Sequence, residues 1–176
     1  MGNLSIFFIL VFTVFFVPNC ILGQDKKSIF LKRDESYLIQ GKKIVFKKGT
    51  EMAFYNNNSI KSGTLANFAD LKIIANNFPF RFKENQSIEF DNFGRVQAGT
   101  FIKDQNLIIN GLNVGLVFKG GEPIRFNNLG KVISGKLLID TTCKTPRGNV
   151  LLKGWCDIEF NSKGQVIRGT IINSGT

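Results

Sequence analysis

A segment of fourteen residues occurs four times in the chain, and this repetition constrains the fold more than any other feature. The copies are Met52–Leu65, Ile88–Phe101, Ile124–Leu137 and Ile158–Ile171. Their phenylalanines, Phe54, Phe90, Phe126 and Phe160, are separated by 36, 36 and 34 residues. A period of this length is typical of repeat proteins, in which each unit buries its apolar face against its neighbours.

Within each copy the apolar residues alternate with polar ones, as in Ile88-Glu89-Phe90. Alternation with a period of two, carried by β-branched and aromatic residues, predicts short strands with one buried face. About four strands of four to six residues fit into each 36-residue unit. We therefore expect an all-β repeat array of antiparallel hairpins that forms an elongated twisted sheet or β-roll. The alternative is a β-solenoid in which the phenylalanines stack as ladders.

Two turn signals recur in the units, and each ends at a position where Gly or Asn, which tolerate positive φ, predominates. The first turn ends at Gly49, Asn85 and Gly121, with Trp155 at this position in the last unit, and the second ends at Asn58, Gly94, Gly130 and Gly164. The second has Asp or Asn after the Phe in most copies, which predicts a type I turn closed by a left-handed residue. Because Asn58 replaces glycine, backbone geometry explains this position better than a ligand does.

A further glycine recurs inside the strand that follows the second turn. Its copies are Gly63, Gly99, Gly135 and Gly169. Glycine within a strand predicts a β-bulge or a close approach between neighbouring chain segments.

The F-x-x-x-G-x-V core, as in Phe90 to Val96, resembles the hairpin repeats of MORN-type proteins and their bacterial variants. The resemblance covers roughly residues 43–171, although the period here is longer and the Tyr-rich Gly-x-Gly pattern is missing. It implies an elongated hairpin array that serves as a scaffold or contact surface, and it brings no catalytic residues with it.

The first 23 residues contain no charged side chain, and Ile6 to Val17 are almost all apolar. This apolar core is too short to span a bilayer, which takes roughly 20 residues, but it suits a signal peptide. Cleavage after Gly23 and lipidation at Cys20, within a loose lipobox, both fit, and an uncleaved anchor is the third reading. We expect an exported protein with a signal peptide (1–23), an entry segment with a half-repeat (24–43) and a hairpin repeat domain (44–176).

Two cysteines, Cys143 and Cys156, remain after the signal peptide. In an exported protein such a pair predicts a disulfide, which over a loop of about 13 residues contributes roughly 3 kcal/mol. A metal site bound by both thiolates is the alternative, but it lacks His and other ligands at suitable spacing. We predict the disulfide.

The formal net charge is 23 − 13 = +10. One lysine recurs beside the first turn of every unit: Lys47, Lys83, Lys119 and Lys153. In a stack of four strands per unit these lysines are about 19 Å apart. They are candidate contacts for a polyanion, although lysines at a sheet edge also prevent aggregation. Acidic polysaccharide, anionic lipid or another envelope protein are the partners we consider, whereas nucleic acid is disfavoured because the phenylalanines occupy inward positions.

Enzyme motifs are missing from the sequence. It has no His, no Gly-x-Ser-x-Gly elbow and no phosphate loop. Glu89 and Glu159 share a repeat position that Ala53 and Arg125 fill elsewhere, so no carboxylate pair recurs. We expect a non-enzymatic structural or binding module at the cell envelope or outside the cell, without a cofactor or metal. A protein that binds polyanions or membrane surfaces is the alternative, and a secreted hydrolase comes third.

Overall fold

The computed structural model describes residues 27–74, 78–109, 114–145 and 148–172, and within them the chain forms seventeen β-strands and no helix. Nine strands form one continuous sheet, and the other eight form four separate hairpins. The sheet contains, in spatial order, β1 (Lys27–Phe30), β4 (Glu51–Phe54), β5 (Ile60–Thr64), β8 (Ser87–Phe90), β9 (Val96–Thr100), β12 (Pro123–Phe126), β13 (Val132–Lys136), β16 (Asp157–Phe160) and β17 (Val166–Arg168). The predicted all-β array of hairpins is confirmed.

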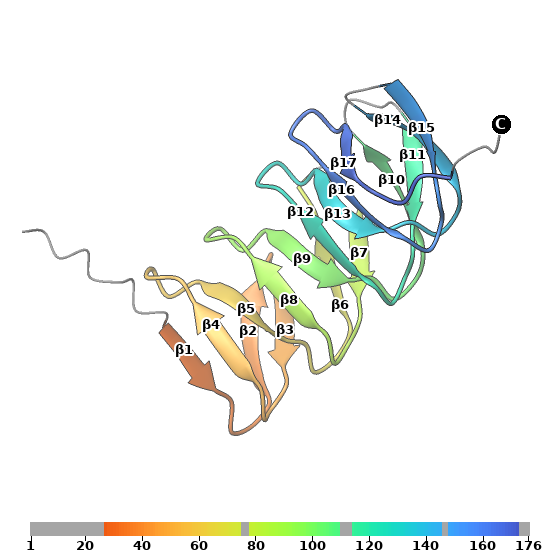
Figure 1. Ribbon diagram of the computed structural model, residues 1–176. Helices are drawn as coiled ribbons and strands as arrows, with labels where there is room; N and C mark the ends of the chain where they lie inside the picture. The colour runs from red at the N-terminus through yellow and green to blue at the C-terminus, as the bar shows by residue number, and fades with distance from the viewer. Residues whose placement is uncertain (1–26, 75–77, 110–113, 146–147, 173–176) are drawn as a thin grey trace, which may run out of the picture.

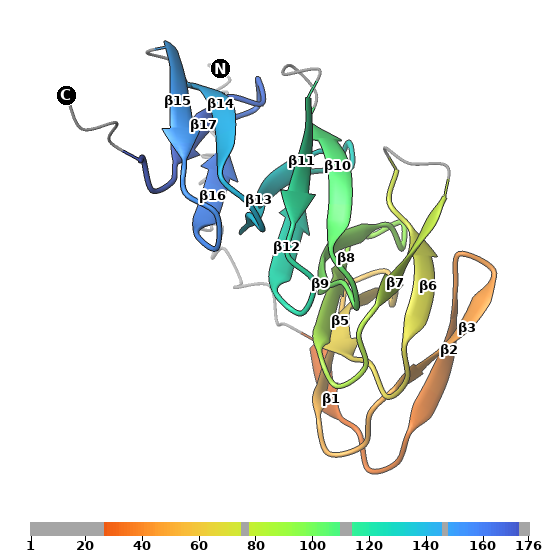
Figure 2. The ribbon, with the colours of Figure 1, turned by 90° about the vertical axis from the view of Figure 1, so that its right-hand side faces the viewer.

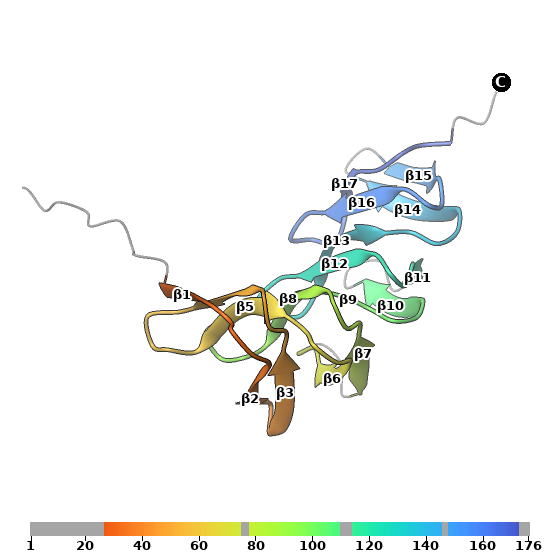
Figure 3. The ribbon, with the colours of Figure 1, turned by 90° about the horizontal axis from the view of Figure 1, so that it is seen from below.

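The four hairpins pack on one face of this sheet (Figures 1 and 3). They are β2 (Glu35–Ile39) with β3 (Lys42–Phe46), β6 (Ala69–Lys72) with β7 (Pro79–Phe82), β10 (Gln105–Ile109) with β11 (Val114–Phe118), and β14 (Thr141–Thr145) with β15 (Gly148–Leu152). Each repeat therefore gives two strands to the sheet and two to the hairpin layer. A single bridge joins each hairpin to the sheet, for example between Phe82 and Phe101.

Every strand pair between the named strands is antiparallel, which excludes the β-solenoid alternative. In a solenoid, equivalent strands of successive coils pair in parallel. Here the strand equivalent to β5 in the next repeat is β9, and β8 lies between them.

Both predicted turns have the expected backbone. Left-handed φ values occur at every predicted position: Gly49 (74°), Asn85 (59°), Gly121 (77°) and Trp155 (61°) in the first turn, and Asn58 (62°), Gly94 (75°), Gly130 (72°) and Gly164 (76°) in the second. In the β8–β9 turn, Gly94 N donates to Asp91 O at 3.0 Å, and Asp91 N donates to Arg95 O at 2.9 Å. The Asp91 carboxylate also accepts hydrogen bonds from the amides of Phe93 and Arg95, both at 2.9 Å.

The recurrent strand glycines lie beneath buried side chains. An added Cβ at Gly63, Gly99 or Gly135 would stand 2.6–2.8 Å from a ring carbon of Phe46, Phe82 or Phe118. The predicted close approach is therefore confirmed, and the partner is an aromatic ring. The bulge lies two residues earlier, as at Lys61, because Ala53 pairs with Ser62 while Phe54 pairs with Ile60.

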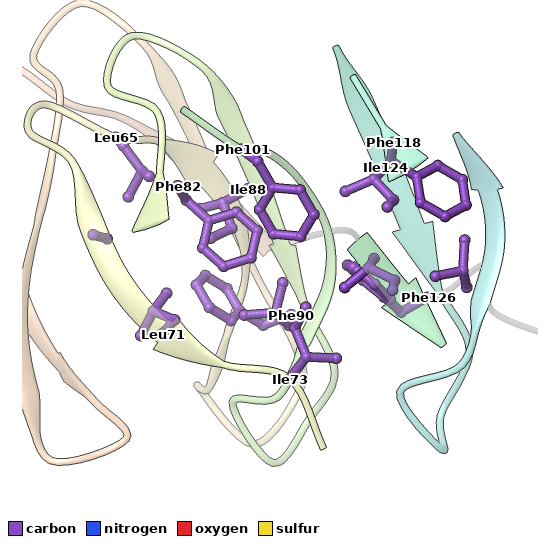
Figure 4. Packing of buried hydrophobic residues seen from close by; sticks show 14 of the residues in the cluster. Leu65, Leu71, Ile73, Phe82, Ile88, Phe90, Phe101, Phe118, Ile124 and Phe126 are labelled. Atoms are coloured by element: carbon purple, nitrogen blue, oxygen red, sulfur yellow. The ribbon is translucent and has the colours of Figure 1, made fainter. Parts of the chain in front are cut away.

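The core lies between the sheet and the hairpin layer, and its largest members are phenylalanines (Figure 4). The Phe101 ring centroid is 5.1 Å from that of Phe82 and 5.2 Å from that of Phe80. Burying one such side chain contributes about 1.5–3 kcal/mol, so these rings hold the hairpin layer of a repeat on its part of the sheet. The Phe101 ring also lies 6.3 Å from that of Phe126 in the next repeat. The inward placement predicted for the repeat phenylalanines is confirmed for Phe90, Phe126 and Phe160, which are at most 4% exposed.

The predicted signal peptide (1–23) and Cys20 lie outside the described residues. Of the predicted entry segment (24–43), residues 27–43 form β1, β2 and the beginning of β3. The predicted boundary at residue 44 falls inside β3, because β2 and β3 form a complete hairpin.

Candidate functional site

The four repeated lysines lie on one edge of the array, where the hairpins join the sheet. We call this edge, formed by residues 31–35, 47–51, 83–86, 102–104, 119–122, 138–140 and 153–157, the base edge (at the bottom in Figure 2). Each lysine amide donates to a carbonyl of the sheet: Lys47 to Thr64, Lys83 to Thr100 and Lys153 to Thr170 at 2.8 Å, and Lys119 to Lys136 at 2.9 Å. The structure therefore brings the predicted row onto one edge.

Two of these lysines contact the left-handed turn residue of the next repeat. Lys47 Nζ donates to Asn85 Oδ1, and Lys119 Nζ stands 3.7 Å from the centroid of the Trp155 ring. The 19 Å spacing expected between the lysines is therefore wrong. Only two strands per repeat enter the sheet, so the spacing along the sheet is about 2 × 4.8 ≈ 10 Å.

Acidic side chains accompany the lysines on the base edge. Asp34, Asp104 and Asp140 each accept a hydrogen bond at 2.7 Å from a first-turn amide. Glu122 lies 3.0 Å from Lys136 Nζ and 3.9 Å from Lys119 Nζ. Close to these carboxylates, the lysine row makes a mixed-charge surface rather than a uniformly positive one.

The opposite edge carries the unbalanced positive charge. We call it the tip edge: the second turns with the bulge residues after them (55–61, 91–97, 127–133, 161–167) and the described free ends of the hairpins (38–43, 72–74, 78–79, 108–109). In Figure 1 the second turns all project to the same side of the sheet. The basic side chains within these ranges are Lys42, Lys43, Lys61, Lys72, Arg95, Lys131 and Lys163. Asp91 is the one acidic residue in these ranges, so the tip edge has a net charge of 7 − 1 = +6.

Asp91 itself is already neutralised within the tip edge. Its carboxylate forms an ion pair with the Arg95 guanidinium, and the carboxyl side chain is only 10% exposed. Burial acts to raise the pKa of Asp91, but the hydrogen bonds from the Arg95 and Phe93 amides and the Arg95 charge outweigh burial and lower it. Asp91 therefore stays ionised and stabilises the turn. Its carboxylate pairs with Arg95 and does not neutralise the lysines of the tip edge.

Large apolar side chains are exposed along the same edge. They are Leu38 (78%), Phe78 (80%), Phe93 (75%), Ile108 (76%) and Leu129 (64%). Phe93 and Leu129 are repeat equivalents at the apex of the second turn, followed two residues later by Arg95 and Lys131. The Arg95 guanidinium carbon lies 4.9 Å from the centroid of the Phe93 ring. The tip edge therefore combines protruding apolar groups with cations.

The first hairpin is fixed to this edge by polar contacts. Gln40 Oε1 accepts a hydrogen bond from Lys72 N at 2.8 Å, and Gln40 Nε2 donates to Lys72 O at 2.9 Å. A depression of about 340 Å³ lies between this hairpin and the turns that contain Asn58 and Phe93. The hairpin tips and second turns thus form one continuous surface at this end.

The sequence pattern did not reveal the tip edge as a candidate site. Its basic residues do not recur at one repeat position: the residue after the left-handed one is Ser59, Arg95, Lys131 or Gln165. The lysines that do recur at one repeat position lie at the first turn, on the base edge. The available signal was the pair of apolar residues, Phe93 and Leu129, at turn apices that Asn57 and Lys163 fill in the other repeats.

The predicted disulfide is not present in the structure, in which Cys143 and Cys156 are both free thiols. Cys143 lies on β14 opposite Val150, two residues from the Thr141–Leu152 pair toward the hairpin tip, and Cys156 follows Leu152 on the other side of that pair. Cys143 and Cys156 therefore lie on opposite sides of the Thr141–Leu152 pair. Two residues of strand span about 6.6 Å, so Cys143 alone is about that far from the pair, whereas a disulfide needs its two Cα atoms within about 7 Å of each other. Burial raises the pKa of Cys143, which further lowers its reactivity.

The described residues contain no group of three or more Cys, Asp or Glu side chains placed to hold a metal ion. They also include no helix with the length and apolar character needed to cross a membrane. Comparison of the chain with protein-family models, with curated proteins and with solved structures found no match.

Proposed function

We propose that the protein is an exported, non-catalytic repeat module that binds an anionic membrane surface through its tip edge. One observation carries the proposal: the exposed apolar side chains and the excess of cations occupy the same edge of the array. Proteins that lie on membranes combine these two properties, because apolar groups enter the headgroup region while cations attract anionic lipids.

The difference in net charge between the two edges favours the tip edge, rather than the lysine row of the base edge, as the surface that binds an anionic membrane. The tip edge carries +6, whereas several carboxylates accompany the lysines of the base edge. A basic residue close to an anionic bilayer contributes about 1 kcal/mol. Six uncompensated charges on a protruding edge are enough for reversible binding.

The kind of apolar residue favours lipid over polysaccharide. Leu38, Ile108 and Leu129 have no group that hydrogen-bonds to a sugar, and all three are more than 60% exposed. Exposed apolar side chains in a monomeric protein mark contact surfaces when they gather on one side. The resemblance to MORN-type repeats is consistent with a contact surface of this kind, and the apolar segment at residues 6–17 with export.

Binding to vesicles tests the proposal. Flotation with vesicles containing 30% phosphatidylglycerol is compared with flotation with pure phosphatidylcholine. We expect binding to the anionic vesicles alone, weakened by salt. Replacing Lys131 and Lys163 with Gln should lower the affinity by roughly 30-fold at low salt, because two charges contribute about 2 kcal/mol near the bilayer.

The matched control is the double replacement of Lys83 and Lys119 with Gln on the base edge. Both variants remove two positive charges, so equal losses indicate net charge alone and contradict the proposal. A third variant, Phe93→Ser with Leu129→Ser, keeps all charges. If it binds vesicles as well as the unmodified protein, insertion of the tip edge is excluded and a soluble polyanion becomes the better ligand.

A further inference from the structure

The three junctions between repeats in the large sheet have the same register. At each junction, the strand glycine of one repeat stands opposite an isoleucine of the next: Gly63 opposite Ile88, Gly99 opposite Ile124, and Gly135 opposite Ile158. The incoming strand always has the pattern Ile-x-Phe. Since glycine has no side chain, the space over it is filled by the Phe ring of the hairpin layer and by the Met or Ile of the neighbouring sheet strand in the same repeat.

The backbone continues the match beyond the strands. Leu65 N donates to Gln86 O at 3.1 Å, and Asn85 N donates to Leu65 O at 2.8 Å. The same exchange joins Leu137 to Cys156 and Trp155, at 3.0 and 2.8 Å. At these junctions, the backbone N–H and C=O groups on the outer edge of one repeat form hydrogen bonds with a strand and a turn of the next repeat.

At β17 the same edge lacks a neighbouring strand within the described part of the chain. β17 follows β16 as β5 follows β4, and it is the last strand of the sheet order. Ile171 occupies the repeat position of Leu65, Phe101 and Leu137; it is 54% exposed, whereas each of those three is 1% exposed.

An apolar depression of about 560 Å³ opens beside this edge. Its lining includes Val150, Leu152, Val166, Ile167 and Ile171. Leu152 replaces the phenylalanine found in the earlier repeats, and it approaches Gly169 less closely, at 3.2 Å from the position of an added Cβ. The depression is thus the continuation of the core at a place that no described strand covers.

We propose that the β17 edge accepts an antiparallel strand from a partner protein, with the pattern polar-Ile-Glu-Phe. The internal junctions define the register: the isoleucine stands opposite Gly169, and the acidic residue stands opposite Arg168, as Glu89 stands opposite Ser62. Arg168 already pairs with Glu159 of β16 at 2.9 Å, but its side chain is 73% exposed and is open to a second carboxylate on the incoming strand. Oppositely charged side chains across a strand pair attract each other, which favours the acidic residue. Strand addition to an open sheet edge gives affinity through the backbone and specificity through alternate side chains.

No described strand of this pattern is free to pair with β17. All four Ile-x-Phe or Met-x-Phe strands of a second copy lie between two neighbours in its own sheet. Its outermost described strand, β1, runs in the same direction as β17. A copy added end to end in the same orientation therefore pairs the two strands in parallel and breaks the antiparallel register.

Peptide binding tests this inference. The probe is a peptide of residues 85–92 (Asn-Gln-Ser-Ile-Glu-Phe-Asp-Asn), and its control carries Glu89→Arg, the residue type found at Arg125 in the next repeat. Hydrogen exchange should show protection of the amides of residues 168–171 on addition of the probe. The probe should bind roughly two- to fivefold more tightly than its control, the effect of one exposed charge pair.

Two protein variants distinguish binding in the proposed strand register from nonspecific binding to the apolar edge. Arg168→Gln should abolish the difference between the two peptides while both still bind. Ile171→Asp should weaken both peptides without unfolding the protein, since this side chain is more than half exposed. Protection elsewhere, no protection at millimolar peptide, or a concentration-dependent dimer that covers β17 would each overturn the inference. None of these outcomes depends on vesicle binding by the tip edge.

Discussion

Gly99 lies directly beneath the ring of Phe82: a Cβ on Gly99 would stand 2.6 Å from Phe82 Cδ1. Phe82 is fully buried and ends the second hairpin, where it bridges to Phe101 of the sheet. The contact between a glycine of the sheet and an aromatic ring of the hairpin layer recurs in three repeats. It determines how closely the two layers approach.

Replacing Gly99 with Ala should therefore lower the free energy of unfolding by about 1–3 kcal/mol, the usual cost of overpacking. Gly169→Ala is the matched control. Its nearest neighbour is the flexible Leu152 at 3.2 Å, and we expect less than about 1 kcal/mol there. Urea denaturation measures both variants, and equal costs would contradict the packing role of the ring.

Two substitutions of Gly130, whose φ is 72° in the second turn, should differ in how much they destabilise the fold. Gly130→Val should destabilise by more than about 1 kcal/mol, because a β-branched residue strongly disfavours positive φ. Gly130→Asn should cost less than half as much, since Asn58 adopts φ 62° at the equivalent position. Similar losses in a denaturant melt would mean that φ does not determine this preference.

Asp91 predicts a contribution to stability that depends on pH. Its pKa is lowered in the folded protein, so its ionised form stabilises the fold above the unfolded pKa of about 3.9. This stabilisation is lost as the pH falls through the lower, folded pKa. Asp91→Asn keeps the turn, as Asn127 does, but removes the charge pair with Arg95.

We therefore expect the unmodified protein to lose stability more steeply than Asp91→Asn between pH 5 and pH 2. Urea midpoints across this range measure the effect. The reciprocal variant, Asn127→Asp beside Lys131, should steepen the loss. Parallel pH profiles for all three proteins would exclude Asp91 as an acid-sensitive group.

The cysteines should differ in reactivity toward an alkylating reagent. Cys143 is 2% exposed and burial raises its pKa, so it should react only when the protein unfolds. Cys156 is half-buried and should be labelled in the native state. Mass spectrometry of the native protein measures both; a linked Cys143–Cys156 peptide, two hydrogens lighter without reductant, would show that a disulfide forms after all.

The sequence by itself was sufficient to predict the strands and the turns. A left-handed residue such as Gly94 or Asn58 reflects local sterics, and the alternation in Ile88-Glu89-Phe90 reflects one buried face. Both effects act over a few residues, so they can be read from one repeat. The recurrence of the repeats then predicted an array of hairpins.

Only the tertiary structure decided which strands join the continuous sheet. β6 and β8 both alternate apolar and polar residues, yet β8 enters the sheet while β6 enters the hairpin layer. The choice depends on contacts between distant segments, such as the Phe82 ring over Gly99, which no local pattern encodes. This arrangement halves the expected spacing of the lysines and separates Cys143 from Cys156. It also gathers Lys131, Phe93 and Leu129 on one edge, because alternate connections of an antiparallel array all emerge on the same side.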